Sequence, residues 1–320
     1  MEGTSVSFLV HNFWDLTVTG LTLGSIYALI ALGYTLVYGV LRLINFAHSE
    51  VFMVGTFAAL LVLTGPFGLP SGNVTLSMLS VIGYVIVAVL AAMAASGGTA
   101  LIVERVAYRP LRRRNAPTLV FLISAIGASM ALSESFAVWR GRNQEPFPDL
   151  LVPKTEFRLF DADVTNQQIL VILSAVLMMV ALDQFIRRSR LGRGVRAVAQ
   201  DPDTAALMGV NKDRVIALTF LLGGLMAGVA AVLYALRIGT TVYNVGFLLG
   251  IKAFTAAVLG GIGNLRGALL GGMLLGLIEN YGSALIGTQW KDVVAFVALI
   301  VILMFRPTGI LGESLGRARV

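Results

Sequence analysis

The residue types that carry most enzymatic chemistry are scarce in this sequence. It has no cysteine and two histidines, His11 and His48, and it contains neither an H-E-x-x-H nor a G-x-S-x-G pattern. Zinc and serine hydrolases that use those patterns would lack their metal ligands or their nucleophile here. The nucleotide-binding pattern G-x-x-x-x-G-K-S/T is also missing, so the chain is not expected to hydrolyse ATP. We expect no catalytic residue, no metal and no cofactor.

Several polar side chains instead lie within or beside long apolar runs. Such groups are costly in a bilayer and tend to mark a solute path or a buried contact. Lys252 and Glu279 lie in neighbouring predicted helices, so a structural ion pair and a solute-facing role are both open. Two others, Glu134 and Asp183, are close enough to the ends of their runs to reach lipid headgroups. The full set is Glu50, Glu134, Asp183, Lys252, Glu279 and Asn280.

Composition indicates what kind of scaffold must position these groups. The 320 residues are 57% hydrophobic and 13% charged, with a mean hydropathy of +0.85. A soluble domain of this size could not be covered by so few charges, so we expect an all-α integral membrane protein. The net charge of +7 comes from basic residues in short segments between apolar runs. Membrane topology explains that distribution, and no nucleic-acid partner is expected.

Nine apolar runs predict a polytopic bundle of about nine transmembrane helices in one domain, 1–320. Four runs are long enough for roughly 20 residues of helix and carry no charge except Glu134. These are 16–40, 74–103, 118–138 and 215–236. Five are shorter, interrupted or polar near one end: 47–64, 167–186, 247–262, 266–286 and 290–305. The run 247–262 is weak, and a bent or broken helix is an alternative there.

The distribution of basic residues predicts the orientation. One set of inter-helix segments and the C-terminal tail hold 17 of the 24 Lys and Arg residues, and the other side holds 7. The richer side should be cytoplasmic. We therefore expect the N-terminus outside and the C-terminus in the cytoplasm, which requires an odd number of crossings.

Two loops are long enough to have structure of their own. The outer loop, 140–166, has three prolines and predicts an irregular cap or docking surface. The cytoplasmic loop, 187–214, contains signals for a short helix from Pro202 to Met208. Asp201 suits the N-cap, Pro202 the first helical position, and Gly209 the C-terminal stop. A capped, soluble-looking helix on this side favours a protein partner.

Glycines recur at four-residue steps in several predicted helices. That spacing places small residues on one helix face and favours close helix crossing. Gly263, Gly267 and Gly271 form the longest series, and the pairs are Gly20 with Gly24, Gly224 with Gly228, and Gly272 with Gly276.

Four stretches in order along the chain carry a family resemblance. They are Y-G-V-L-R-L-I-N-F-A-H-S-E at 38–50, D-R-V-I-A-L-T-F at 213–220, K-A-F-T-A-A-V-L-G-G-I-G at 252–263, and the segment from K-D at 291–292 to F-R-P-T-G at 305–309. With these motifs the chain resembles, over essentially its whole length, the branched-chain amino acid ABC permeases typified by the LivH protein. Ser49 departs from the glycine usual at that position, and T-A-A-L-M-G at 204–209 is a loose version of the Glu-Ala-Ala motif of other importers.

The resemblance implies one permease subunit of a bacterial or archaeal importer in the cell inner (plasma) membrane. Its expected partners are a LivM-like second permease subunit, two cytoplasmic LivG/LivF-like ABC ATPase subunits and an extracytoplasmic solute-binding protein. The ATPase-coupling residues would be Asp201, Pro202, Asp203, Thr204, Ala205, Ala206, Leu207, Met208 and Gly209. Such a subunit would translocate branched-chain or other neutral amino acids by alternating access, although urea or an amide is also open as the solute.

Candidate residues of the substrate path combine the signature stretches with the polar groups above. They are Asn45, His48, Glu50, Lys252, Thr255, Glu279 and Asn280. For the segment 45–50, helix capping and turn chemistry are the alternative to a path role. The alternative for the whole chain is a solitary secondary transporter or channel that uses Lys252 and Glu279 as an ion-coupled pair.

Overall fold

The structure is a computed structural model, which describes all residues except 1–8, 10, 71, 74–76, 161 and 313–320. Its described part has a long helix at each of the nine predicted ranges. These are α2 (Phe13–Leu41), α3 (His48–Thr64), α4 (Met78–Val103), α6 (Thr118–Arg140), α7 (Asn166–Arg188), α10 (Lys212–Ile238), α11 (Val245–Gly260), α12 (Leu265–Ile286) and α13 (Lys291–Phe305). The prediction of a helical, polytopic membrane protein is thus confirmed.

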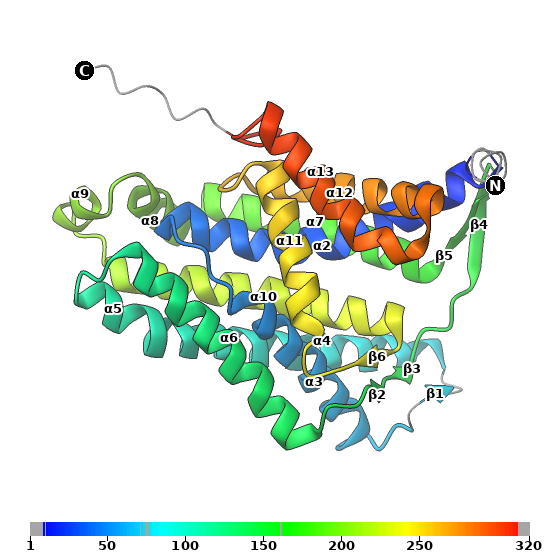
Figure 1. The fold of residues 1–320 in the computed structure, drawn as a ribbon. Helices are drawn as coiled ribbons and strands as arrows, with labels where there is room; N and C mark the ends of the chain where they lie inside the picture. Colours follow the sequence, from blue (N-terminus) through cyan, green and yellow to red (C-terminus); the bar gives the residue numbers. More distant parts are fainter. Residues whose placement is uncertain (1–8, 10, 71, 74–76, 161, 313–320) are drawn as a thin grey trace.

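Seven of the described helices are long and apolar enough to cross a bilayer, when α13 is counted with the preceding turn Thr288–Trp290. The other two, α3 and α11, have 17 and 16 residues and are shorter than a full span. The exact number of crossings and the orientation stay predictions. In Figure 1 the first turns of α2 and the loop 187–214 lie at opposite ends of the bundle.

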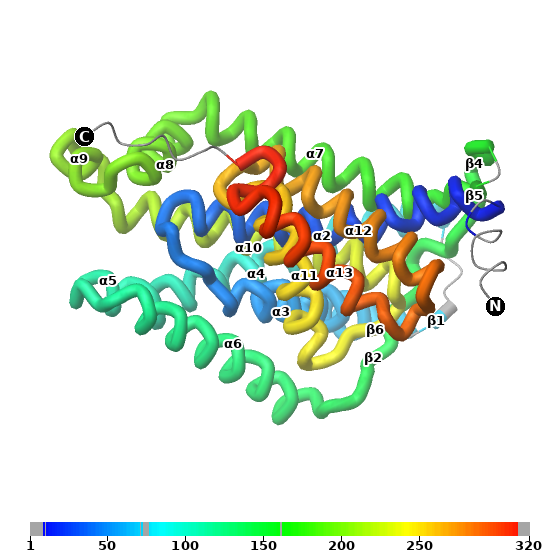
Figure 2. Tube along the Cα trace, turned by 45° about the horizontal axis from the view of Figure 1, so that its top comes forward, coloured from blue at the N-terminus to red at the C-terminus, as the bar shows by residue number. Residues whose placement is uncertain are grey.

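The centre of the bundle is formed by α2 and α10. In each of these helices 72% of the apolar window is buried inside the protein, compared with 6% in the outermost helix, α13. Because α4, α6, α7 and α13 expose large apolar side chains along much of their length, they are the helices that lipid or partner subunits must cover. In both Figure 1 and Figure 2, α6 lies at the periphery.

Glycine contacts explain why the inner helices approach so closely. A Cβ atom on Gly24 of α2 would lie 2.5 Å from the backbone oxygen of Gly272 in α12, closer than atoms can pack. In the same way Gly267 and Gly271 face the backbone of Gly260 in α11, at 2.4 Å for Gly267 and 2.6 Å for Gly271. These glycines therefore allow backbone contact between α2, α12 and α11.

Gly263 was wrongly placed in this helical series. It lies in the turn between α11 and α12, where its φ is +98°, and α12 begins only at Leu265 because Asn264 caps it through the backbone N–H groups of Arg266 and Gly267. A positive φ is accessible to glycine without steric cost, so this glycine shapes a turn instead of a helix crossing.

The loop 187–214 contains two helices, α8 (Arg190–Gln200) and α9 (Pro202–Leu207). Sequence analysis predicted the second but missed α8. Ser189 caps α8 by accepting a hydrogen bond from the Gly192 N–H at 2.8 Å, and Val195 and Val198 are buried against the bundle. Arg190, Arg193 and Arg196 are exposed on the other face of α8, and because they recur every third residue along the sequence, this segment resembled an ordinary positively charged loop.

The loop 140–166 is more ordered than an irregular cap, because it contains a hairpin. Strands β4 (Thr155–Leu159) and β5 (Ala162–Thr165) pair antiparallel. Two short pairings also tie the loop to the bundle: β2 (Glu145–Pro146) with β6 (Thr240–Thr241), and β3 (Pro148–Asp149) with β1 (Gly72–Asn73). Phe147, between β2 and β3, is fully buried and anchors the loop.

Candidate functional site

The signature stretch 38–50 forms a turn that returns to the interior of the bundle. Helix α2 ends at Leu41, and its C-cap residue is Arg42, which has a left-handed φ of 54°. The backbone N–H of Arg42 donates to the Tyr38 oxygen. The chain then reverses, and α3 begins in the body of the molecule (Figure 1). Asn45, His48, Ser49 and Glu50 are all buried. A helix start with four polar side chains thus lies inside an apolar bundle.

Two of these residues hold the turn in place. The Tyr108 hydroxyl lies 3.2 Å from Asn45 Oδ1 and 3.3 Å from the Ile44 oxygen, so it ties the turn to the end of the α4 segment. The His48 ring fits a slot between Gly33 of α2 and Gly223 of α10, where a Cβ on Gly33 would lie 2.2 Å from His48 Nε2. These contacts support the turn-forming alternative for Asn45 and a packing role for His48.

Glu50 is the least compensated charge of the interior. Its Oε1 accepts hydrogen bonds from Ser129 Oγ of α6 at 3.3 Å and from Ser49 Oγ at 3.5 Å, whereas Oε2 has no partner among the described residues. The residue is 1% exposed. No basic side chain in the described part of the chain makes an ion pair with it, so its partial compensation comes from two hydroxyls and from the N-terminal end of α3.

Helix α11 crosses directly over this turn. A Cβ on Gly246 would lie 2.2 Å from the Ser49 backbone oxygen and 3.0 Å from Glu50 Oε2, and one on Gly250 would lie 2.3 Å from Ser49 Cβ. The two short helices, α3 and α11, therefore meet at the buried carboxylate. Gly246 and Gly250 were not predicted as site residues, although their four-residue spacing was the signal that could have identified them.

Lys252 and Glu279 form an ion pair at 2.7 Å, and both side chains are buried. Lys252 also contacts Asp292 of α13 at 2.6 Å, Lys291 lies 3.5 Å from Glu279, and the Tyr27 hydroxyl donates to Glu279 at 3.2 Å. We call Lys252, Glu279, Lys291 and Asp292 the charge tetrad. Its two positive and two negative charges cancel, which favours the structural role for Lys252 and Glu279.

Lys291 and Asp292 of the charge tetrad, and Tyr27 beside it, were not among the predicted site residues. The K-D pair at 291–292 was the available signal, because it opens one of the stretches that carry the family resemblance. Two other candidates for the substrate path, Thr255 and Asn280, form their hydrogen bonds outside the charge tetrad. Thr255 Oγ1 donates to the Ile251 oxygen of its own helix, and Asn280 Nδ2 donates to the Leu16 oxygen of α2 at 2.6 Å.

The short helix α9 has the caps that its sequence predicts and ends at Leu207, with Met208 as its C-cap. Asp201 accepts hydrogen bonds from the backbone N–H groups of Asp203 and Thr204 and from Thr204 Oγ1. These bonds, with the Thr204 hydroxyl contributing most, lower the pKa of Asp201 below its ordinary value. Gly209 follows with a φ of +84°.

The surface of α9 is apolar at its C-terminal end. Leu207 and Met208 are 88% and 81% exposed, and Ala206 is also exposed, whereas Ala205 packs into the core. In Figure 1, α9 lies at the far end of the molecule, beyond the long helices. A rigid, capped helix thus presents two large apolar side chains to a region outside the bundle.

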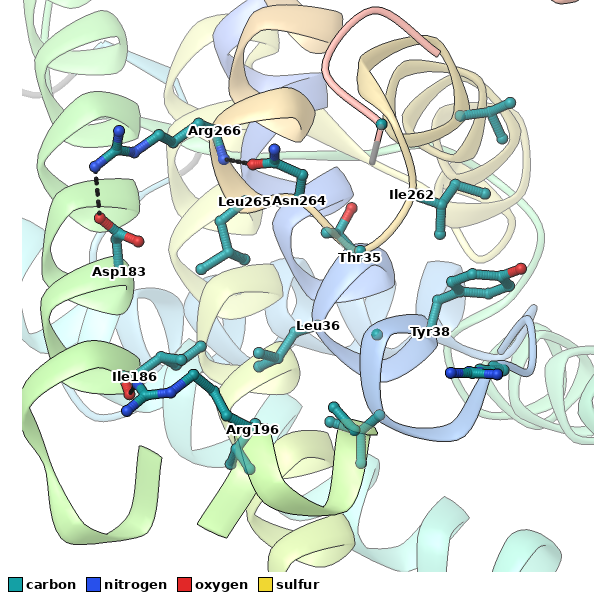
Figure 3. A pocket seen from close by; sticks show the side chains of 18 of the residues that line it. Thr35, Leu36, Tyr38, Asp183, Ile186, Arg196, Ile262, Asn264, Leu265 and Arg266 are labelled. Atoms are coloured by element: carbon teal, nitrogen blue, oxygen red, sulfur yellow. Dashed lines mark hydrogen bonds and ion pairs between the residues drawn. The ribbon is translucent and has the colours of Figure 1, made fainter. Parts of the chain in front are cut away.

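A cavity of about 1100 Å³ opens beside this region, at the same end of the molecule. It lies between the ends of α2 and α7, the helix α8, and the turn from α11 to α12 (Figure 3). Four arginines line it with a single acidic residue, Asp183, which binds Arg187 at 2.8 Å and Arg266 at 3.3 Å. Asp183 lies in the last two turns of α7, and its contact with lipid headgroups stays a prediction.

Comparison with known proteins adds to this geometry. Residues 16–303 match the family model described as the permease component of branched-chain amino acid transport systems. The permease protein BraD of Pseudomonas aeruginosa is 45% identical over 307 residues, which cover 95% of this chain and 97% of BraD. LivH of Escherichia coli is 45% identical over 301 residues, covering 92% and 94%. A protein of Methanocaldococcus jannaschii described as a probable LivH permease is 26% identical over 304 residues, which cover 90% of this chain and 89% of that protein. This chain therefore belongs to the family of branched-chain amino acid transport permease components.

Proposed function

We propose that the chain is the membrane-spanning permease subunit of an ABC importer for branched-chain or other neutral amino acids, acting as a single transmembrane domain in the cell inner membrane. Its partners would be a second, LivM-like permease subunit, two LivG/LivF-like ATPase subunits and an extracytoplasmic solute-binding protein. The solute class is supported by BraD and LivH, two relatives at 45% identity that are named as permeases of branched-chain amino acid transport systems. ATP binding to the partner ATPases would then change which face of the bundle is open.

The observation that carries this proposal is the helix α9. The chain has no nucleotide-binding pattern of its own, so the energy must come from another subunit. A helix that projects from the bundle with exposed Leu207 and Met208 can dock in a groove of such a subunit. Because α9 is bonded to the bundle through Lys212 and Asp203 at 3.3 Å and through buried Ala205, force on it reaches α10 directly.

The test compares substitutions at Ala206 in proteoliposomes that contain the permease pair, the ATPases and the binding protein. Ala206→Glu should abolish ATP-driven leucine uptake and the stimulation of ATPase activity, because a long charged side chain obstructs a close helix-in-groove contact. Ala206→Ser should retain both activities. Asn115→Asp, which adds a negative charge to the loop between α5 (Arg109–Arg113) and α6, controls for charge alone. Uptake that persists in liposomes without any ATPase would refute the proposal and favour a solitary transporter.

We further propose that Glu50 lies on the solute path. A neutral amino acid carries an ammonium group, for which an otherwise unpaired carboxylate is a suitable partner in an apolar interior. The free oxygen Oε2 and the meeting of two short helices at this residue support the assignment. Interrupted helices that meet inside a bundle are the usual way for a membrane protein to expose backbone polar groups to a solute.

A further inference from the structure

We propose that the cavity between α2, α7, α8 and the α11–α12 turn binds the phosphate headgroup of an anionic phospholipid. The lining includes none of the residues proposed for the solute path and no residue of α9, and the proposal does not rest on the transport function.

The charge of the cavity is the first observation. Arg42, Arg187, Arg196 and Arg266 line it together with Asp183, which leaves a formal net charge of +3 on these five residues. Asp183 is already engaged by Arg187 and Arg266, as Figure 3 shows for Arg266. The Arg42 side chain has no hydrogen bond or ion pair within the described residues. Its guanidinium group is therefore available to bind a ligand in the cavity.

The second observation is the apolar remainder of the lining. Leu36, Ile186, Ile262 and Leu265 surround the same hollow as Arg196 and Arg266 in Figure 3. These residues come from the ends of membrane helices or from the turn between them, so the cavity lies where the apolar part of the bilayer meets its headgroups. A volume of about 1100 Å³ accommodates an amphiphile that has an anionic head and part of an acyl chain.

The match with lipid chemistry follows from these two observations. Guanidinium groups bind phosphate oxygens with paired hydrogen bonds, and basic pockets between membrane helices on the cytoplasmic side suit anionic headgroups. A soluble phosphate ester shares the headgroup chemistry but would leave the apolar lining in contact with water. The anionic phospholipid satisfies both parts of the cavity.

The experiment measures lipid binding without transport. The full-length chain is purified in detergent, stripped of lipid, and titrated with phosphatidylglycerol or phosphatidylcholine, while bound lipid is counted by native mass spectrometry. We expect phosphatidylglycerol to bind at least about 25-fold more tightly than phosphatidylcholine, since each of two basic side chains near a bilayer surface contributes about fivefold. Arg42→Gln with Arg196→Gln should weaken phosphatidylglycerol binding about 25-fold and leave phosphatidylcholine unchanged.

Arg114→Gln is the matched control, because it removes a cytoplasmic-end charge outside the cavity lining. It should bind like the wild type. Arg42→Gln alone, at an exposed position without a side-chain partner, should show about a fivefold loss if the double variant fails to fold. Equal binding of the two lipids, or equal losses in Arg114→Gln and the cavity variants, would overturn the proposal. Displacement of phosphatidylglycerol by an equal concentration of glycerol phosphate would also overturn it, by assigning the site to a soluble anion.

Discussion

Two carboxylates in this protein are equally buried but differently surrounded. Glu279 and Glu50 are each 1% exposed, and each lies beside α11. Glu279 has Lys252 at 2.7 Å, Lys291 at 3.5 Å and the Tyr27 hydroxyl at 3.2 Å. Glu50 has two serine hydroxyls and makes no ion pair with a cation among the described residues. In both residues the second oxygen, Oε2, has no hydrogen-bond partner in the described part of the chain, so the cations are what differ. Burial alone therefore does not identify a functional charge, whereas the extent of its compensation separates the two cases.

The physical reason lies in desolvation. Removing a charge from water is costly, and nearby opposite charges recover most of that cost. The charge tetrad is such a closed arrangement and binds α11, α12 and α13 together. At the Glu50 turn, part of the desolvation cost of the carboxylate is not recovered by the protein. A positively charged group of the solute can reduce that remaining cost during transport. The predictions below change one region at a time.

The largest effect is expected when the tetrad loses its central cation. Lys252→Met leaves Glu279 with the more distant Lys291 as its one described cation, beside the Tyr27 hydroxyl. Removing one partner of a buried ion pair costs about 3–5 kcal/mol. Thermal unfolding in detergent should show this loss. Lys212→Met, which removes the exposed bridge to Asp203, should cost no more than about 1 kcal/mol.

A second change should partly restore the protein. In Lys252→Met with Glu279→Gln, the buried charge is removed together with its partner, so stability should recover relative to Lys252→Met alone. If Lys252→Met unfolds at the same temperature as Lys212→Met, the tetrad does not stabilise the bundle.

An intermediate effect is expected at the Glu50 turn. Gly246→Ala places a methyl group 2.2 Å from the Ser49 oxygen and 3.0 Å from Glu50 Oε2. Overpacking of this kind costs about 1–3 kcal/mol, and the displaced α3 should also lower uptake. Gly98→Ala is the control, because a Cβ at Gly98 in α4 meets no atom within 4 Å and alanine favours a helix by up to about 1 kcal/mol. Equal stability of the two variants would show that α11 does not pack against the turn.

The smallest effects on stability come from single hydrogen bonds. Tyr27→Phe removes the bond to Glu279, and Ser129→Ala removes a bond to Glu50. Because each acceptor oxygen keeps another partner, each change should cost about 0.5–1.5 kcal/mol. Transport should distinguish them. Tyr27→Phe should retain leucine uptake, and Ser129→Ala should reduce it, because Ser129 orients the carboxylate on the proposed path. A greater loss of uptake in Tyr27→Phe would reverse the assignment.

Sequence patterns predicted much of the scaffold, since long apolar runs need little tertiary information to be recognised as membrane helices. Local capping chemistry also identified α9, because Asp201 and Thr204 interact within one turn. Helix α8 was not predicted, because its closely spaced arginines are typical of a solvent-exposed loop although Val195 and Val198 are buried. Local rules favoured a helical position for Gly263, but the cap at Asn264 starts α12 after it.

The interior contacts could not be predicted for a different reason. Lys252 and Glu279 were paired correctly as neighbours, but whether Lys291 and Asp292 complete them depends on how α13 docks. Asn280 faces α2 and bonds to the Leu16 oxygen, a direction that no pattern within α12 specifies. Similarly, the depth of Glu50 follows from the chain reversal after Arg42, which brings a helix start into the bundle.

Our central claim is that Glu50 serves transport and the tetrad serves stability, and the substitution Glu50→Gln tests it most directly. Unfolding temperature in detergent and ATP-driven leucine uptake in proteoliposomes are measured on the same preparation. Because glutamine fills the same space without a buried charge, stability should stay within about 1 kcal/mol of the wild type or rise. Uptake should fall at least about tenfold. Normal uptake, or a loss of stability as large as that of Lys252→Met, would contradict the claim.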